Sequence, residues 1–290
     1  MSPAACGHTL SFTFLVLYLS AVATNNPKRA PAIRISDKNR REMSPERDFP
    51  GETPVQLRYC ILSSPRSGST LLGRLLYETK CAGDPQEYFN PPLLAIERER
   101  CGDPKLNLNG FMRHMEQRRT SPNGVFGMKL HYSQMLGAFR SPKPNQAMLN
   151  MLRRFNALIW IRRRDRAAQA ISQIVAQHTQ VWSSEDARHG KATELKIHPY
   201  ECIRALQMVS GDDFGWERLI AASGLKVHQV WYEDLVADYE TQSRAVLRHL
   251  GLDGQVEHIP APPLEKQAGE INQKLRARWM KYMGIDEVAK

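Results

Sequence analysis

The sequence predicts an α/β fold in which a central parallel sheet is flanked by helices. Short apolar runs of the kind that form strands buried on both faces recur along the chain, and segments with helical spacing separate them. Strands that alternate with helices are joined by crossovers, which makes their sheet parallel. The chain has 290 residues, of which 42% are hydrophobic, so it can bury one sizeable core, and a single domain is expected over residues 51–290.

The strand candidates follow one another with turns and helices between them. Three segments have the composition of strands, namely 59–62, 156–161 and 226–232. A further apolar run, 125–130, follows a turn at 121–124. In open parallel sheets ligands bind beyond the carboxyl ends of the strands, so the functional residues are expected there.

The helices are predicted from apolar residues at helical spacing. One begins near Ser69, directly after the first strand, and a long helix runs over about 166–180. A third, amphipathic helix covers 241–250 and is ended by Gly251. Residues 93–119 are expected to be irregular at first and then helical.

Residues 1–50 are expected to form a leader that is poorly ordered or serves targeting or anchoring. Residues 10–23 are apolar but too few for a comfortable membrane span, and 21–23 would suit signal-peptidase cleavage. Basic residues follow this run and none precedes it, which would hold the catalytic part in the cytoplasm if the run inserted. Cytoplasmic localisation is therefore the expectation. A membrane anchor, a secretory signal and a true start at Met43 remain as alternatives.

The charge balance favours acidic partners. A formal net charge of +10 suits nucleic acid, anionic lipid or a polyanionic small molecule. The arginine clusters lack the interleaved aromatic residues that nucleic-acid binding favours, so no nucleic-acid partner is expected. The five cysteines are scattered, with no C-x-x-C pair and no metal-ligand spacing against the nine histidines, which predicts reduced thiols and no metal site.

The segment PRSGST, residues 65–70, predicts an anion-binding loop between the first strand and its helix. Backbone N–H groups and the positive end of the helix dipole converge at such a loop. Gly68 supplies backbone freedom, and Arg66 offers a forked cationic donor. The remaining candidate ligand-binding residues of the loop are Pro65, Ser67, Ser69 and Thr70. The alternative is an ordinary turn in which Ser and Gly serve only for capping.

This loop differs from the P-loop of nucleotide triphosphatases. That motif, G-x-x-x-x-G-K-[ST], has a lysine just before the hydroxyl residue that holds magnesium. Here Ser69 follows Gly68 directly and the loop has no lysine. The pattern therefore favours binding of phosphate or sulfate without the kinase arrangement.

A second anion-binding candidate is the arginine-rich segment IRRRDRAAQAIS, residues 161–172. Four arginines in five positions follow a predicted strand at the point where a helix begins. The alternative is a solvated basic helix start, which is the usual role of a run of charges.

The run ILSSPRSGSTLLGRLLYETKCAGDPQEYF resembles the Stf0 family of sulfotransferases. The family has an S-x-R-S-G-S-T-L-L loop followed, after one helix, by G-x-P-Q-E-[FY]-F, and both motifs are present here at 64–72 and 83–89. Similar segments are GVFGMKL at 124–130, the arginine-rich strand end and LEKQA at 264–268. Agreement of several separated motifs is more specific than any one of them. The resemblance covers about residues 58–280 and implies a P-loop-like sulfotransferase fold.

The resemblance also implies the donor and the roles of residues. It implies transfer of a sulfuryl group from 3′-phosphoadenylyl sulfate (PAPS) to a hydroxyl, without a metal, with Glu87 as the general base. Desolvation by Tyr88 and Phe89 is expected to raise the pKa of Glu87. The family pattern places the 3′-phosphate on Arg163 and Ser172, although Arg164 stands where the family has proline, so Arg162, Arg163 and Arg164 all remain open. The other implied residues are Lys129, for the departing oxygens, and Lys266 and Gln267, for closing over the cofactor.

Three functional classes follow from these patterns. The first is a sulfotransferase that acts on a carbohydrate or glycolipid. The second is a P-loop kinase or nucleotidase, which the missing lysine disfavours. The third is a non-catalytic binder of polyanions. His131, His178 and His198 show no partner pattern, and a structural or solvent role is expected for each. The acceptor and the oligomeric state are not predicted by the sequence.

Overall fold

The fold is known from a computed structural model that describes residues 33, 35–51, 53–139, 144–182, 195, 197–262 and 270–284. The chain divides into two units, Met1–Arg34 and Ile35–Lys290, and the elements below all belong to the second.

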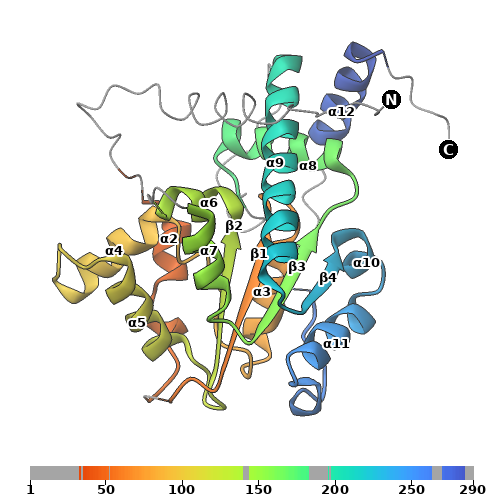
Figure 1. The fold of residues 1–290 in the computed structure, drawn as a ribbon. Helices are drawn as coiled ribbons and strands as arrows, with labels where there is room; N and C mark the ends of the chain where they lie inside the picture. The colour runs from red at the N-terminus through yellow and green to blue at the C-terminus, as the bar shows by residue number, and fades with distance from the viewer. Residues whose placement is uncertain are drawn as a thin grey trace, which may run out of the picture. The chain divides into compact units, whose positions relative to one another are not determined.

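A four-stranded parallel sheet forms the centre of this unit, which confirms the predicted fold class (Figure 1). The strands are β1 (Leu57–Ser63), β2 (Val125–His131), β3 (Ala157–Arg162) and β4 (Val227–Trp231), in the order β2-β1-β3-β4. The three strand candidates are confirmed, and the apolar run after the turn at 121–124 forms β2. The central strand β1 pairs Leu62 with Leu130 on one side and with Trp160 on the other.

Helices join the strands as crossovers. Three predicted helices are present, with α3 (Ser69–Glu78), α8 (Arg166–Thr179) and α11 (Tyr239–His249) close to their expected bounds. Residues 93–119 were expected to begin irregularly, but they lie almost wholly in two helices, α4 (Pro91–Cys101) and α5 (Leu108–Arg119). The other helices described are α2 (Asp37–Glu42), η1 (Pro45–Arg47), α6 (Tyr132–Ala138), α7 (Pro144–Leu152), α9 (Pro199–Ser223), α10 (Tyr232–Ala237), η3 (Asp253–Gln255) and α12 (Glu270–Tyr282).

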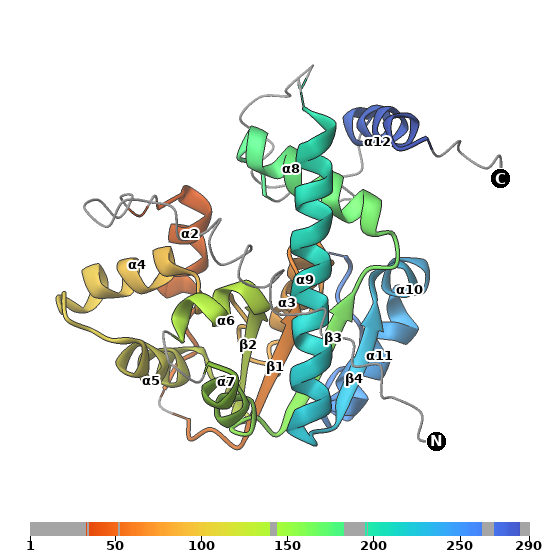
Figure 2. The same cartoon turned by 45° about the horizontal axis from the view of Figure 1, so that its top comes forward.

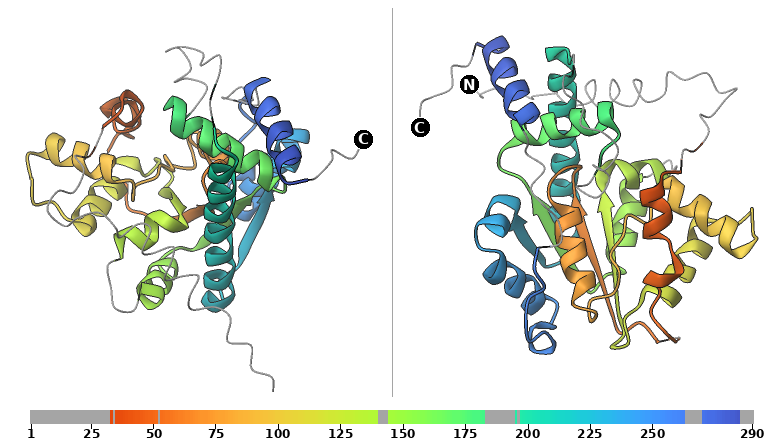
Figure 3. Two further views of the ribbon diagram at one scale, coloured as in Figure 1. Left: turned by 90° about the horizontal axis from the view of Figure 1, so that it is seen from above. Right: turned by 180° about the vertical axis from the view of Figure 1, so that it is seen from behind.

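The two faces of the sheet are covered by different helices. Along β1, Cys60 and Leu62 point into one buried cluster together with Trp216 of α9, whereas Tyr59 and Ile61 point into another with the leucines of α3. Successive strand residues face opposite sides of a sheet, so both faces of this strand are apolar. Figure 2 shows α9 crossing one face, and the right panel of Figure 3 shows α3 on the other.

Part of the predicted leader belongs to this core. Ser36 caps α2 by accepting a hydrogen bond from the backbone N–H of Asn39 (3.2 Å), and Met43, just after the helix, is only 1% exposed. Arg47 of η1 donates to both carboxylate oxygens of the buried Asp84. Residues 35–50 therefore pack with the domain, whereas the sequence analysis placed the boundary at 50.

Among the described residues, no helix is both long and apolar enough to cross a membrane. The apolar run at 10–23 lies outside the described residues.

Candidate active site

The candidate site lies at the carboxyl ends of β1, β2 and β3. The predicted loop follows β1 directly and leads into α3, whose first residue is Ser69. β2 ends at His131 and β3 at Arg162. Because the strands are parallel, their carboxyl ends lie on the same edge of the sheet, which brings segments far apart in sequence to one place (Figure 1).

The loop has the backbone conformation of an anion cradle. Gly68 has φ +92° and Arg66 has φ +62°, both in the left-handed region. A Cβ atom at position 68 would lie 2.4 Å from the ring of Tyr232, the first residue of α10. Glycine is therefore required here both for its backbone angle and for the close approach of the Tyr232 ring.

One hydroxyl of the loop has an unmet hydrogen-bonding capacity. Ser67 is fully buried, and its Oγ has no hydrogen-bond partner within the described part of the chain. Buried polar atoms in folded proteins are nearly always bonded, so an orphaned hydroxyl in a loop of this shape fits a ligand oxygen. Ser69 is also buried, at the first position of α3.

Residues from α8 and α9 hold the loop in place. Ser64 donates to Oδ1 of Asp213 (2.8 Å), and the amide of Gln169 donates to Ser64 Oγ (2.9 Å) and to the carbonyl of Pro65 (2.7 Å). The indole of Trp216 donates to the carbonyl of Ser63 (2.7 Å). The sequence analysis assigned no role to Asp213 or Trp216, because only tertiary packing brings α9 against the loop.

The structure brings the two anion-binding candidates together. Nε of Arg66 donates to Oγ of Ser172 on α8 (2.9 Å), and its Nη1 donates to the carbonyl of Trp182 (2.5 Å). The predicted residues Arg66 and Ser172 are thus neighbours although they lie 106 positions apart in the chain.

The three consecutive arginines after β3 have different surroundings. Arg162 pairs with Asp213 (3.0 Å) and lies over the Trp160 ring, and the exposed Arg164 forms a two-pronged pair with Asp234 (2.5 and 2.8 Å). Nε of Arg163 is buried and has no hydrogen bond among the described residues; its carboxylate contact, to Glu233, is 3.9 Å long.

Arg163 also adjoins the loop. Its guanidinium lies 5.0 Å from the centre of the Tyr232 ring, the same ring that packs against Gly68. Of the three arginines, Arg163 therefore combines the weakest carboxylate contact with a place beside the loop. The role of Tyr232 was missed from sequence, where it marked only the end of a strand.

The G-x-P-Q-E-Y-F segment runs alongside β2 and presents Glu87 to that strand. Gln86 forms a parallel bridge with Met128, and its carbonyl accepts from the backbone N–H of Lys129 (2.9 Å). Gly83 has φ +68°, and a Cβ there would lie 2.7 Å from the carbonyl of Val125, so the chain can turn in so closely only with glycine. Asp84 anchors the turn through its contacts with Arg47 and Arg119.

Glu87, Lys129 and Thr70 form a continuous polar cluster beside the loop. Nζ of Lys129 lies 3.1 Å from Oε1 of Glu87 and 3.3 Å from Oγ1 of Thr70. Lys129 is only 2% exposed, so this contact takes place largely away from water. The ammonium therefore joins the loop hydroxyl to the carboxylate, and the geometry brings together three of the predicted site residues.

His131 and Gln134 complete the surroundings of Glu87. Nε2 of His131 lies 3.4 Å from Oε1 of Glu87, and the Gln134 amide donates to Oε2 (2.9 Å). Nδ1 of His131 contacts Oγ of Ser63 (2.9 Å). The sequence analysis assigned His131 a structural or solvent role. The signal available was its place two residues after Lys129, because alternate residues of a strand share a face.

The expected upward shift of the Glu87 pKa is wrong in direction. Burial does favour the neutral acid, but the positive charge of Lys129 and the contact with His131 outweigh it and hold the pKa of Glu87 well below its usual range. Tyr88 and Phe89 are buried in the core cluster beneath the segment, with Tyr88 donating to the Asp84 carbonyl. Glu87 is consequently a carboxylate at neutral pH, the form that can accept a proton.

Two predicted residues cannot be placed, and one potential metal cluster lies outside the candidate site. Lys266 and Gln267 fall outside the described residues. Within the described chain, Glu97, Cys101 and His114 of α4 and α5 could offer ligand atoms to one ion. Oε1 of Glu97 is already bonded to His114 (2.9 Å) and to Arg118 (2.5 Å), whereas its buried Oε2 has no hydrogen-bond partner among the described residues.

Comparison with known proteins agrees with this geometry. The family model for Stf0 sulphotransferase matches residues 58–281. The chain belongs to the Stf0 sulfotransferase family. It is therefore a sulfotransferase, which favours the first functional class over the kinase and the non-catalytic binder. The matched residues include the loop, the Glu87 segment and the arginine-rich end of β3.

Two curated relatives are similar over most of their length. The trehalose 2-sulfotransferase of Mycobacterium tuberculosis is 26% identical over 243 residues, which cover 73% of this chain and 90% of the relative. The trehalose 2-sulfotransferase of Mycolicibacterium smegmatis is 28% identical over 245 residues, with the same coverage. A solved sulfotransferase from Alicyclobacillus acidocaldarius is 14% identical and covers 80% of this chain and 97% of its own, at a TM-score of 0.43. The fold assignment rests on the strand order rather than on that likeness.

Proposed function

We propose that this Stf0 sulfotransferase moves the sulfuryl group of PAPS to a hydroxyl of a carbohydrate or glycolipid acceptor, with Glu87 as the general base. The observation that carries the proposal is the contact of Lys129 with both Thr70 and Glu87. It joins the loop where a phosphosulfate would bind to the carboxylate that would activate the acceptor. Such a base must lie within hydrogen-bond reach of the hydroxyl it deprotonates.

The donor would be held at both of its charged ends. The backbone N–H groups of the loop and the orphaned hydroxyl of Ser67 suit the 5′-phosphosulfate, together with Arg66, Ser69 and Thr70. Arg163 and Ser172 suit the 3′-phosphate, because Arg163 has the weakest carboxylate contact among the three arginines and Ser172 already meets Arg66. Lys266 and Gln267 remain proposed residues for closing over the nucleotide.

The chemical step is an in-line displacement at sulfur. The acceptor oxygen forms a bond to sulfur while the bond from sulfur to the bridging phosphate oxygen breaks, and its electron pair stays on the phosphate. The acceptor proton passes to Oε1 or Oε2 of Glu87. Lys129 stabilises the negative charge that develops on the departing oxygen, and adenosine 3′,5′-bisphosphate leaves.

The low pKa of Glu87 is compatible with this role once the donor is considered. In the structure, Lys129 forms a close ion pair with Glu87 and lowers the pKa of that carboxylate. A bound phosphosulfate would offer Lys129 a second anionic partner within reach of Thr70. The phosphosulfate and Glu87 would then compete for the Lys129 ammonium. The weaker ion pair would raise the pKa of Glu87, and thus its basicity, when the acceptor is also bound.

The acceptor class is supported by the relatives. Both mycobacterial relatives are named for trehalose, a small carbohydrate, and each matches 73% of this chain. A hydroxyl of a carbohydrate, free or in a glycolipid, therefore fits best as the nucleophile.

Donor binding and transfer can be tested separately. Calorimetry should show adenosine 3′,5′-bisphosphate binding with equal affinity with and without magnesium. Incubation with ³⁵S-labelled PAPS and a panel of saccharides and lipid extracts should then give a sulfated product by mass analysis. Binding of ATP only in the presence of magnesium, with no response to adenosine 3′,5′-bisphosphate, would contradict the proposal.

A further inference from the structure

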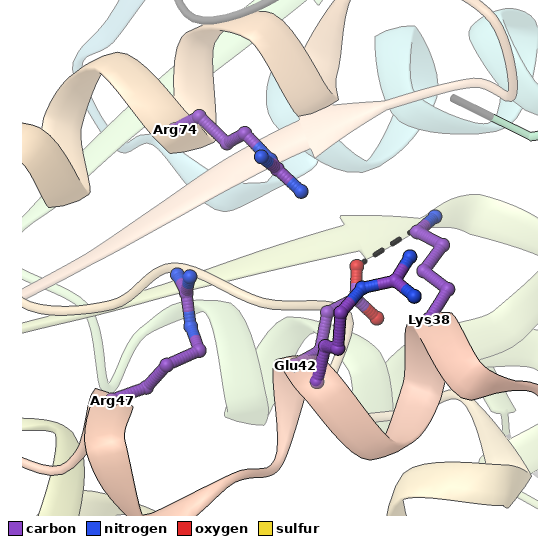
Figure 4. A pocket seen from close by; sticks show the side chains of 5 residues that line it. Lys38, Glu42, Arg47 and Arg74 are labelled. Carbon is purple, nitrogen blue, oxygen red and sulfur yellow. Dashed lines mark ion pairs between the residues drawn. The ribbon is translucent and has the colours of Figure 1, made fainter. Parts of the chain in front are cut away.

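Two of the polar clusters in the described chain lie outside the candidate site, and they differ in how their charged groups are bonded. The first lines a cavity of about 180 Å³ between α2, η1 and α3. Figure 4 shows the ion pair of Lys38 with Glu42 there, and Arg47 in the same wall pairs with Asp84. The second cluster lies between α4 and α5 and consists of three potential metal ligands, Glu97, Cys101 and His114.

The carboxylate of Glu97, in the second cluster, is buried and uses one of its two oxygens. Glu97 is 0% exposed, and its Oε1 contacts Nδ1 of His114 (2.9 Å) and Nη1 of Arg118 (2.5 Å). Its Oε2 is also buried and has no hydrogen-bond partner among the described residues. Because buried polar atoms in folded proteins are nearly always bonded, this oxygen has the capacity to bind a further group.

Helical spacing brings two further donor groups to this oxygen's carboxylate. Cys101 follows Glu97 by four residues on α4, so both side chains lie on one face of that helix. His114 and Arg118 have the same spacing on α5, which lies beside α4 in Figure 2, and both contact Glu97. One ligand atom from each of Glu97, Cys101 and His114 lies within 4.8 Å of the others. The thiol of Cys101 is not in a disulfide, and its contact with the Arg98 carbonyl is long, at 3.9 Å.

A carboxylate oxygen, a cysteine sulfur and an imidazole nitrogen form a donor set that suits zinc. Zinc accepts all three, and sites with three protein ligands hold water in the fourth position. Zinc–ligand bonds of about 2.0–2.3 Å place tetrahedral ligand atoms roughly 3.3–3.7 Å apart, so side-chain movements on the order of 1 Å complete the geometry. The side chain of His114 is 30% exposed and Cys101 is partly exposed, so both have room to move. Arg118 holds Oε1 of Glu97, as outer-shell partners of metal-binding carboxylates do.

We propose that Glu97, Cys101 and His114 form a zinc site that joins α4 to α5. Oε2 of Glu97, Sγ of Cys101 and a ring nitrogen of His114 bind the ion, with water as the fourth ligand. Cys101 binds as the thiolate, and its proton leaves to solvent. The inference goes beyond the proposed function and does not depend on it. The sequence analysis predicted no metal site, because these residues come together only when α4 packs against α5.

The two helices joined by the ion lie next in sequence to the proposed reacting residues. α4 begins at Pro91, four residues after Glu87, and α5 ends at Arg119, ahead of β2, which carries Lys129. An ion that binds the folded chain more tightly than the unfolded chain stabilises the fold. Zinc is therefore expected to raise the Tm of the protein by fixing α4 against α5.

The test uses Co²⁺ as a probe, because its absorption spectrum reports its ligands. The full chain is reduced, stripped of metal with a chelator, desalted and titrated with Co²⁺. Binding of the thiolate should give a sulfur-to-cobalt charge-transfer band in the near ultraviolet, and Zn²⁺ should displace the cobalt and remove the band. Calorimetry with Zn²⁺ should give a Kd on the order of 10 μM or tighter.

Variants locate the site. Cys101→Ser should abolish the charge-transfer band, and His114→Gln should weaken zinc binding by on the order of a hundredfold. Cys81→Ser is the matched control for the cysteine, because Cys81 is likewise partly exposed and free. His178→Gln is the control for the histidine, because His178 pairs with Glu201 on α9 (2.8 Å). Both controls should leave the band and the zinc affinity unchanged. If Glu97→Gln fails to fold, the Cys101 and His114 variants decide.

Alkylation gives a readout that does not depend on spectroscopy. Zinc should protect Cys101 from iodoacetamide, as measured by mass analysis, and leave the labelling of Cys81 unchanged. A Kd for zinc weaker than about 10 μM, the lack of a charge-transfer band, or a band that survives Cys101→Ser would overturn the zinc site. None of these outcomes bears on the binding of adenosine 3′,5′-bisphosphate, so this inference and the proposed function can fail separately.

Discussion

Two polar regions flank the loop, and they differ in how their charges are used. At the end of β2, a single carboxylate, Glu87, collects a lysine, a histidine and an amide around it. At the end of β3, four arginines lie within five positions, yet Arg162 and Arg166 pair with Asp213, and Arg164 pairs with Asp234. Three of the four arginines in this charge-rich region are thus engaged in ion pairs within the protein.

The comparison shows that charge density along a sequence is a poor measure of charge available to a ligand. Carboxylates from α9 and α10 pair with three of the four arginines and fix their positions. The described contacts of Glu87 are with hydrogen-bond donors, namely Lys129, His131 and Gln134, so its cluster can exchange partners when an anion arrives. A ligand site needs charged groups that are held in position but can still exchange their protein partners for a ligand.

The largest expected effect tests the Glu87 region. Glu87→Gln should keep the shape of the side chain and lose the proton acceptor, so we expect turnover to fall by about 10²- to 10⁴-fold with little change in affinity for adenosine 3′,5′-bisphosphate. Glu78→Gln is a matched control, because Glu78 is exposed and pairs with the exposed Lys80. Unchanged turnover in the Glu87 variant would remove this residue from the mechanism.

Lys129 tests how the same cluster sets the protonation of its carboxylate. Lys129→Met should lower kcat by roughly 10²-fold, because a donor aimed at the departing oxygen is lost. Lys129 helps to hold the pKa of Glu87 down, so its removal raises that pKa, and the acidic limb of the kcat/KM profile should move to higher pH. Lys129→Arg keeps the charge and should leave the limb in place. A limb that does not move in the methionine variant would mean that another group titrates.

The arginine run offers an internal comparison of its own. Arg163→Gln should weaken binding of adenosine 3′,5′-bisphosphate by about ten- to a hundredfold, as expected for loss of a charge-assisted contact with phosphate. Arg164→Gln should change it by less than about twofold, because an exposed ion pair contributes little. Binding to adenosine 5′-monophosphate, which lacks the 3′-phosphate, should be unaffected in both variants. The reverse order of effects would assign the 3′-phosphate to Arg164.

The smallest effect concerns Ser172, which connects the two regions through Arg66. Ser172→Ala removes one neutral hydrogen-bond donor and the partner of the Arg66 side chain, so affinity for adenosine 3′,5′-bisphosphate should fall by about two- to tenfold. Calorimetry on the variant measures it, with Ser133→Ala as a control, since Ser133 donates to Asp212 (3.0 Å) rather than contacting Arg66. An effect equal to that of Arg163→Gln would show that Ser172 acts mainly by positioning Arg66.

The sequence alone determined the framework of this protein. Apolar runs and helical spacing specified β1, β3, β4 and the helices α3, α8 and α11, because burial on two faces and amphipathicity leave a direct mark on residue order. The loop at 65–70 was recognisable because its chemistry is contained in six consecutive residues. The identification of Glu87 as a candidate base required the family motif, because a single glutamate in a loop has no distinguishing pattern by itself.

Only the tertiary structure decided which of these residues work together. The contact of Lys129 with Glu87 and Thr70, the Tyr232 ring against Gly68 and the ion pairs of the arginine run all join segments distant in the chain. The direction of the Glu87 pKa shift also depends on the tertiary structure, because it is set by charges on a neighbouring strand. The packing of α2 with the core, before the expected domain boundary, was likewise visible only in the structure. The order of apolar and polar residues along a segment predicts whether that segment is buried. The interaction between two charges depends instead on their distance, which is fixed only after the sheet has formed.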